Sequence, residues 1–319
     1  MILTPEVLAI LIINTTLAFF AFIAFILSVK IYLNWDLESS STLQYKLEKQ
    51  SYLTATIIKY IFIVKVPLFL FFIFTLDKIS NILIGAMCGA GVVDATEYGT
   101  YLFVLKIINL YIFAYWLALN SEDIKHENQP YTKQKFGMFI IFFLFFMVEV
   151  VLEGVMFSAI DVKEMVDCCG TIYSTSSTTY IADILKLSPY IIVGIFYTNF
   201  LLIILFYFLK RKYIFSFLNL IFIITSLISL IAFFGTYIYQ LPTHHCPFCF
   251  LQKDYNYVGY IIYIFLFVGT FFGMITGFVE TSLEELNKKY KISLWFNILY
   301  VVLVTSYVVV FFIRNGVWL

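Results

Sequence analysis

Charged residues are scarce in this chain of 319 residues. Asp, Glu, Lys and Arg make up 13% of it, whereas they make up about 25% of an ordinary globular domain. The charges also balance, with 20 basic and 20 acidic residues, so the chain lacks the basic surplus of a nucleic-acid-binding protein and no nucleic-acid partner is expected. A glycine-rich ATP-binding loop is absent too, so any pumping would draw on a gradient or on a partner subunit.

Hydrophobic residues take the place of the missing charges: they make up 62% of the chain, and aromatic residues make up 20%. A helix needs roughly 20 apolar residues to cross a bilayer, and in lipid it satisfies its own backbone hydrogen bonds. The sequence therefore predicts an all-α integral membrane protein, surrounded by the lipid bilayer, with a single polytopic membrane domain over residues 1–319. We expect a bundle of eight transmembrane helices at about residues 5–35, 52–76, 101–119, 137–160, 189–209, 214–240, 257–279 and 292–313.

The orientation follows from the basic residues in the connections between spans, because positive charge is retained on the cytoplasmic side. The first, third, fifth and seventh connections hold twelve Lys and Arg residues, and the opposite face holds five. The N and C termini are therefore both expected on the outer face. In a bacterium this is the periplasmic face of the inner (cytoplasmic) membrane. The first span lacks the basic leader and small-residue cleavage site of a signal peptide, so we expect it to stay in the mature chain.

All the cysteines of the chain fall in connections that this orientation places outside. The richest stretch is the hexapeptide His244-His245-Cys246-Pro247-Phe248-Cys249 between the sixth and seventh spans. The other three thiols lie in the second and fourth connections. The candidate outer-face site therefore consists of Cys88, Cys168, Cys169, His244, His245, Cys246 and Cys249.

A soft-metal site is the first hypothesis for these residues. Thiolate and imidazole ligands select Cu(I), and a Cys-x-x-Cys spacing lets two sulfurs turn toward one ion. Zinc suits the same ligands. Cys246, Cys249 and His245 are the expected direct ligands, with Cys88 and one of Cys168 or Cys169 completing or relaying. The protein would then bind, deliver or transport copper, with a periplasmic metal-carrier protein as a candidate partner.

Thiol-disulfide chemistry is the second hypothesis, and it would make the chain an enzyme with Cys246 and Cys249 as catalytic residues. Cys246-Pro247-Phe248-Cys249 resembles the Cys-Pro-x-Cys pattern of glutaredoxin-like and periplasmic thioredoxin-fold oxidants, in four residues only. The eight-span pattern lacks the βαβ units of that fold. The nearer resemblance is to membrane disulfide-forming proteins, which pass electrons from loop thiols through a Cys-x-x-Cys pair to a quinone. A periplasmic thiol-carrier protein would then be the partner.

The third reading is a channel or transporter subunit with structural disulfides and a partner membrane subunit. Five thiols cannot all pair within one chain, and the neighbours Cys168 and Cys169 rarely reach the geometry needed to pair with each other. Of the three hypotheses, metal handling comes first.

A second group of candidate residues lies inside the spans. Glu149 and Glu153 are four residues apart and share one helical face, while Lys65 and Lys106 lie in the second and third spans. Counting about 1.5 Å per residue from the span ends predicts two ion pairs, Lys65 with Glu149 near mid-membrane and Lys106 with Glu153 nearer the outer face. An unpaired charge at these depths costs several kcal/mol. The pairs would clamp the helices together or carry protons or ions.

The orientation can be tested at the C terminus. Alkaline phosphatase is active only outside the cytoplasm, so an alkaline phosphatase fused after Leu319 should be active. A green fluorescent protein fusion at the same residue should stay dark. Cytoplasmic fluorescence from that fusion would overturn the predicted topology.

Overall fold

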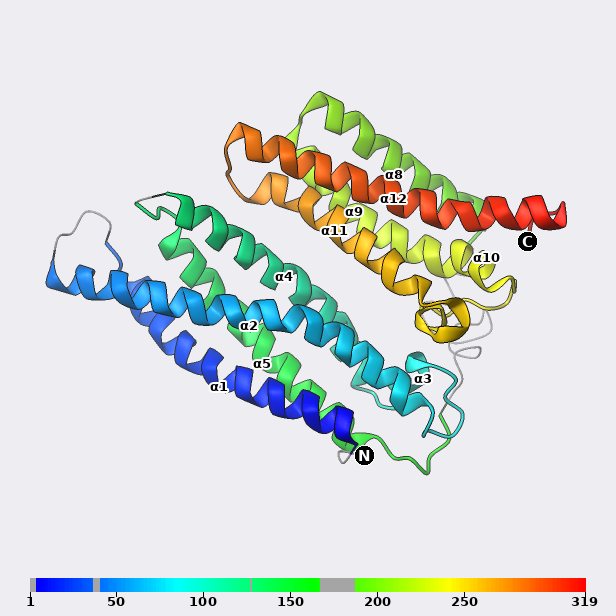
Figure 1. The fold of residues 1–319 in the computed structure, drawn as a ribbon, viewed down its shortest axis with the longest axis horizontal. Coiled ribbons are helices and arrows are strands. Elements are labelled where there is room, and N and C mark those ends of the chain that lie inside the picture. The colour runs from blue at the N-terminus through cyan, green and yellow to red at the C-terminus, as the bar shows by residue number, and fades with distance from the viewer. Residues whose placement is uncertain (1–3, 37–40, 127, 167–186) are drawn as a thin grey trace. The chain divides into compact units, whose positions relative to one another are not determined.

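The computed structural model describes residues 4–36, 41–126, 128–166 and 187–319, and all regular structure in these ranges is helical (Figure 1). The chain divides into two compact units. Unit 1 comprises Met1–Ile84 and Val92–Met165, and unit 2 comprises Gly85–Gly91 and Val166–Leu319. The short helix α3 (Gly89–Asp94) contains the point at which the chain passes between the two.

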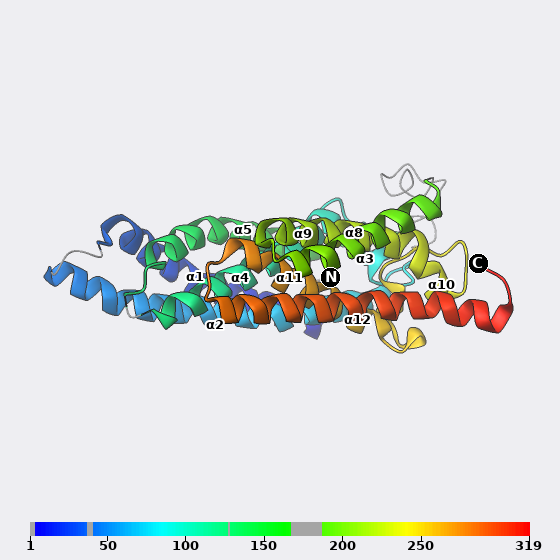
Figure 2. The ribbon, with the colours of Figure 1, turned by 90° about the horizontal axis from the view of Figure 1, so that it is seen from above.

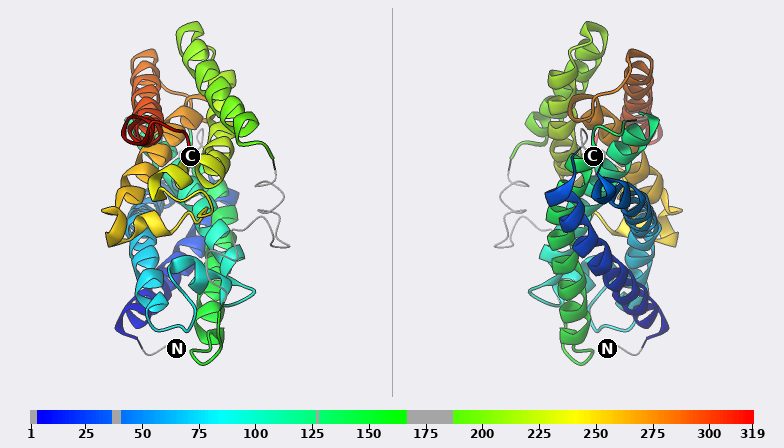
Figure 3. Two further views of the ribbon diagram at one scale, coloured as in Figure 1. Left: turned by 90° about the vertical axis from the view of Figure 1, so that its right-hand side faces the viewer. Right: turned by 90° about the vertical axis from the view of Figure 1, so that its left-hand side faces the viewer.

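Unit 1 contains the long helices α1 (Pro5–Asn34), α2 (Thr42–Ser80), α4 (Gly99–Lys125) and α5 (Thr132–Ala159). Helix α1 packs against both α2 and α5, and α4 packs against α5 and α2 (Figure 3). Aromatic side chains fill the space between α2 and α4. The Phe62 ring stacks on Phe113 at a centroid distance of 4.3 Å and meets Trp116 edge-on at 5.5 Å.

Unit 2 begins with the hairpin of α8 (Pro189–Leu209) and α9 (Lys212–Ser229). Helix α9 continues through a π-helical turn, η1 (Leu230–Phe234), into α10 (Gly235–Tyr239). The short 3-10 turns η2 (Cys249–Leu251) and η3 (Lys253–Tyr255) follow, and then α11 (Val258–Phe278) and α12 (Leu283–Asn315). Figure 2 shows α12 as one unbroken helix.

Eight helical segments in the described residues are long and apolar enough to cross a membrane. Each hides only one stripe: in α1 the buried positions include Val7, Ile10 and Asn14, while Ile12 and Phe19 are about two-thirds exposed. In a bilayer such exposed apolar faces contact the lipid acyl chains. The chain is therefore a multi-pass helical membrane protein.

Two helices extend well beyond the apolar runs that predict them. Helix α2 begins at Thr42 and α12 at Leu283, in polar sequence on the N-terminal side of each run. Each starts behind a serine whose side chain accepts a hydrogen bond from the backbone three residues on, Ser41 from Gln44 and Ser282 from Glu285. Each N-cap satisfies one of the first backbone donors, so the helix can begin in the polar sequence that precedes its apolar run.

The glycines of α11 let two neighbouring helices approach closely. Gly269, Gly273 and Gly277 recur every four residues, a spacing that favours close helix contact, and α11 packs against both α9 and α12. A Cβ atom at Gly273 would lie 2.2 Å from the Asn219 side chain of α9. Asn219 Oδ1 in turn accepts a hydrogen bond of 2.8 Å from Asn297 Nδ2 of α12. The glycine stripe is thus the slot into which a buried polar cluster fits.

Replacing Gly273 with alanine should destabilise unit 2 by about 1–3 kcal/mol, because the new methyl group overlaps Asn219. The matched control is Gly194→Ala in α8, where a Cβ meets nothing within 4 Å and alanine should be neutral or stabilise the helix by up to about 1 kcal/mol. Unfolding of both variants in a detergent titration, followed by circular dichroism, measures the difference. Equal stabilities would show that this contact is not tight.

Candidate functional site

Three cysteines from two distant stretches of the sequence meet in unit 2. The sulfurs of Cys88, Cys246 and Cys249 all lie within 4.8 Å of one another. Cys88 and Cys246 are 158 residues apart, yet their Sγ atoms are 3.5 Å apart, well beyond the about 2.05 Å of a disulfide bond. All three side chains are buried. This is a cluster of three converging soft ligands.

The loop that carries Cys246 and Cys249 is held in shape by two tyrosines. The Tyr239 hydroxyl donates to the backbone oxygen of Cys246 and accepts from the backbone N–H of Phe250 at 3.1 Å. The Tyr263 hydroxyl donates to the backbone oxygen of Pro247 at 2.8 Å. Both tyrosines lie on helices that flank the loop, so the two sulfurs are held by rigid elements.

One backbone group of the loop bonds to a sulfur directly. The N–H of Phe248, two residues after Cys246, lies 3.4 Å from Cys246 Sγ. An N–H donor of this kind favours the thiolate form, which is the form that binds metals. The surrounding peptide is therefore suited to an anionic sulfur.

The third sulfur belongs to Cys88, which lies directly before α3 and three residues after a turn at Gly85. Gly85 takes a φ of 93°, a left-handed conformation that favours glycine. Gln252, in the connection between η2 and η3, donates through Nε2 to the backbone oxygen of Met87 at 3.2 Å. Met87 itself is 67% exposed, in contrast to Cys88, which is fully buried. The cysteine and not the methionine therefore belongs to the cluster.

The two histidines of the hexapeptide are half-buried and are not members of the three-sulfur cluster. The His244 ring meets the Tyr239 ring edge-on at 4.3 Å. His245 Nδ1 lies 2.9 Å from the backbone oxygen of Ile231, in the π-helical turn η1. A carbonyl oxygen only accepts, so Nδ1 carries a proton. When the ring is neutral, Nε2 is then the nitrogen with a lone pair for a metal ion.

Cys168 and Cys169, which the sequence also points to, lie outside the described residues. His126, the remaining histidine, ends α4 in unit 1 and has no part in the cluster.

Four charged residues of the spans meet in unit 1, where they form a closed ring of side chains. We call Asn14, Lys65, Lys106, Glu149 and Glu153 the polar ring. Each is at most 5% exposed, and the four long helices of unit 1 all contribute to the ring.

The contacts of the polar ring can be followed from Lys65. Its Nζ donates to Glu149 Oε1 at 2.6 Å and to Asn14 Oδ1 at 3.0 Å. Asn14 then donates through Nδ2 to Glu153. Lys106 Nζ closes the ring, at 3.2 Å from Glu153 Oε1 and 2.9 Å from Glu149 Oε1. With two ammonium groups and two carboxylates, the ring is neutral as a whole.

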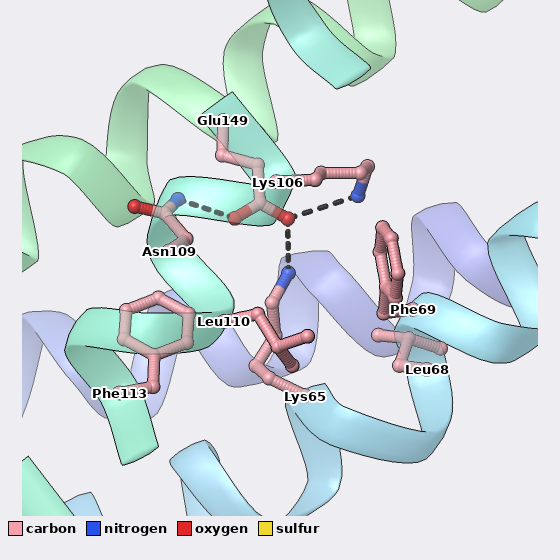
Figure 4. A pocket seen from close by; sticks show the side chains of 8 residues that line it. All are labelled: Lys65, Leu68, Phe69, Lys106, Asn109, Leu110, Phe113 and Glu149. Atoms are coloured by element: carbon pink, nitrogen blue, oxygen red, sulfur yellow. Dashed lines mark hydrogen bonds and ion pairs between the residues drawn. The ribbon is translucent and has the colours of Figure 1, made fainter. Parts of the chain in front are cut away.

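The structure thus places both sequence-predicted pairs in contact, and adds members that sequence reasoning missed. Lys106 touches both glutamates, and Asn14 joins Lys65 to Glu153. Asn109 of α4 donates a third hydrogen bond to the Glu149 carboxylate, as Figure 4 shows. Spacing could have suggested Asn109, since it lies one turn after Lys106 on the same helical face.

No protein-family model matches the chain, and comparisons with curated proteins and with solved structures find no match either. The two sites are therefore interpreted from their own chemistry.

Removal of the Glu149 carboxylate should destabilise unit 1 more than removal of any other carboxylate named here. Glu149→Gln replaces the carboxylate shared by two buried ammonium groups with a neutral amide, so the ring keeps one uncompensated positive charge, which should cost about 3 kcal/mol or more. Glu153→Gln removes a carboxylate that contacts one lysine and one amide, so a smaller loss is expected. The exposed Glu164→Gln should change nothing. Detergent unfolding measures all three, and an unchanged midpoint for Glu149→Gln would contradict the ring's contribution to stability.

Proposed function

We propose that the protein binds a soft metal ion, foremost Cu(I), at Cys88, Cys246 and Cys249, for its delivery or transport. The observation that carries this proposal is the convergence of three buried sulfurs from two distant stretches. Three sulfurs that each lie about 2.3 Å from one ion, the usual metal–thiolate distance, are about 4 Å from one another. The cluster is close to this spacing before any ion is considered.

Coordination number favours Cu(I) over zinc. Cu(I) is satisfied by two or three thiolates, whereas structural zinc takes four ligands. The cluster offers three sulfurs among the described residues. Zinc would need a fourth ligand, for which His245 with its Nε2 lone pair is the candidate within the hexapeptide. Cys168 or Cys169 would serve only as a relay or an additional ligand.

The site belongs, on this proposal, to the outer face of a cell inner membrane. The cysteine-bearing connections carry few basic residues, and the connections on the other side carry most of them. A periplasmic carrier could then exchange copper with the cluster by thiolate transfer. His244 and His245, which are half-buried in the same loop, would be the next ligands to meet an incoming ion.

Thiol-disulfide exchange is the second candidate, and one distance favours it. Cys88 Sγ and Cys246 Sγ are 3.5 Å apart, so a small movement would join them. Oxidation would convert the two thiols to one disulfide and pass two electrons and two protons to a quinone, which becomes a quinol. Cys249 would then be the third thiol, able to attack that disulfide. The sequence pattern had pointed to Cys246 and Cys249 as the reacting pair.

Metal content of purified protein, loaded anaerobically with Cu(I) and washed, tests the proposal. The wild type should retain about one Cu(I) per chain, and Cys88→Ser should lower the affinity more than about 100-fold, because loss of a direct ligand exceeds the loss known for indirect ones. The matched control is Met87→Leu, at the exposed neighbour of Cys88 outside the cluster, which should retain copper.

Two outcomes would contradict the metal proposal. One is wild-type protein that retains no Cu(I) in competition with a chelator. The other is a Cys88→Ser variant with unchanged affinity. A disulfide between Cys88 and Cys246, found by mass spectrometry together with quinone reduction by added dithiol, would favour the redox candidate instead.

A further inference from the structure

The polar ring of unit 1 contains two lysines in unequal surroundings. Lys106 Nζ contacts both carboxylates and lies 4.4 Å from the centre of the Phe72 ring. Lys106 is therefore compensated by two anions and has an aromatic face close by. Lys65 contacts one carboxylate only, through the oxygen that Lys106 shares, and its second partner is the neutral amide of Asn14. Lys65 is the less compensated cation.

The titratable groups around Lys65 are few and can be named. Lys106 comes from α4, and Glu149 and Glu153 come from α5, while α1 contributes the neutral Asn14. The Phe146 ring of α5 lies 5.1 Å from Lys65 Nζ. If Lys65 gave up its proton, Lys106 would still be bound to both glutamates, and the ring would keep its remaining hydrogen bonds.

A small cavity adjoins Lys65. It has a volume of about 10 Å³, close to the room that one water molecule needs. Lys65, Lys106, Asn109 and Glu149 supply its polar lining, among leucine and phenylalanine side chains (Figure 4). Asn14 and Glu153 do not line it. Water in the cavity would therefore meet Lys65 and Glu149 and not the far side of the ring.

Asn109 gives an independent sign that the cavity accepts a donor. Its Nδ2 donates to Glu149 and its side chain is 1% exposed, yet its Oδ1 has no hydrogen-bond partner among the described residues. A buried carbonyl oxygen without a donor is costly. A water molecule in the cavity could donate a hydrogen bond to Asn109 Oδ1 and accept one from the third N–H of Lys65.

We propose that Lys65 is a proton-exchange site inside the membrane, which passes a proton to a water molecule in this cavity and takes one back. In the step, the Nζ–H bond breaks and its electron pair stays on nitrogen. The proton passes through the cavity water to solvent, which leaves a neutral amine at Lys65 and a neutral water in the cavity. The amine can still donate to Glu149 and Asn14, and its lone pair can accept from water. Buried ionisable groups of this kind mark proton pathways in membrane proteins, and this site is independent of the proposed metal centre.

Nitrogen NMR of protein labelled with ¹⁵N-lysine, in detergent micelles, tests the proposal because it distinguishes ammonium from amine at Nζ. Lys65→Arg is the informative variant, since guanidinium keeps the charge and does not deprotonate. Lys59→Arg, at an exposed position of the same helix, is the matched control. Lys106→Arg identifies the second ring lysine.

We expect one Nζ signal, lost in Lys65→Arg and retained in Lys59→Arg, to change reversibly between ammonium and amine within the pH range in which circular dichroism shows intact helices. The Lys106 signal should stay ammonium throughout. A Lys65 signal that stays ammonium over the whole range would overturn the proposal and leave the ring as an ion-pair clamp. Titration of Lys106 in place of Lys65 would overturn it as well.

A cavity-filling variant keeps the test decisive if the arginine does not fit. Leu110→Phe fills the space beside Lys65 without changing a ring residue. It should slow the exchange of the Lys65 Nζ hydrogens with solvent. Exchange at the wild-type rate would show that protons do not reach Lys65 through this cavity, and would overturn the proposal.

Discussion

Lipid supplies no hydrogen-bond partners, and this constraint governs both units. A polar side chain between the helices must find its partner on another helix, because a charge left alone there costs several kcal/mol. The polar ring meets the requirement by closing on itself, so that two ammonium groups, two carboxylates and the Asn14 amide satisfy one another. Its neutrality is what permits charges at the middle of α2 and α5.

Unit 2 meets the same requirement without charges. The Asn219 and Asn297 side chains bond to each other, and the Ser293 hydroxyl donates to the same Asn219 oxygen. Two glycines of α11 make room for this cluster, since a Cβ at Gly269 would overlap Asn297 and one at Gly273 would overlap Asn219. Small residues and neutral amides thus hold α9, α11 and α12 together, whereas ion pairs do so in unit 1. In unit 2, Cys246 and Cys249 lie in a loop, and the polar cluster between the helices is neutral.

The sequence allowed the fold to be predicted further than the sites. Eight apolar runs predict eight helices because length and hydropathy are local properties, but the caps at Ser41 and Ser282 extend two of them in a way that hydropathy does not register. Lys65, Lys106, Glu149 and Glu153 stand out because a charge in an apolar run is rare. Asn14 does not stand out, since an amide among threonines in α1 carries no such signal. Asn14 shares the buried face of α1 with Val7 and Ile10, and this becomes informative only when the structure shows which face of α1 is buried.

The meeting of Cys88 with Cys246 could not be derived from spacing, because it depends on which connections come together in space. What the sequence does dictate is where a site of variable charge can exist. A metal-binding thiol cluster changes its net charge when protons leave and an ion enters, and lipid compensates such a change less well than water does. The hexapeptide, which includes two half-buried histidines, lies instead in the connection between α10 and α11. The charges between the helices of unit 1 are therefore balanced by one another within the polar ring, whereas the thiols of unit 2 lie in a loop.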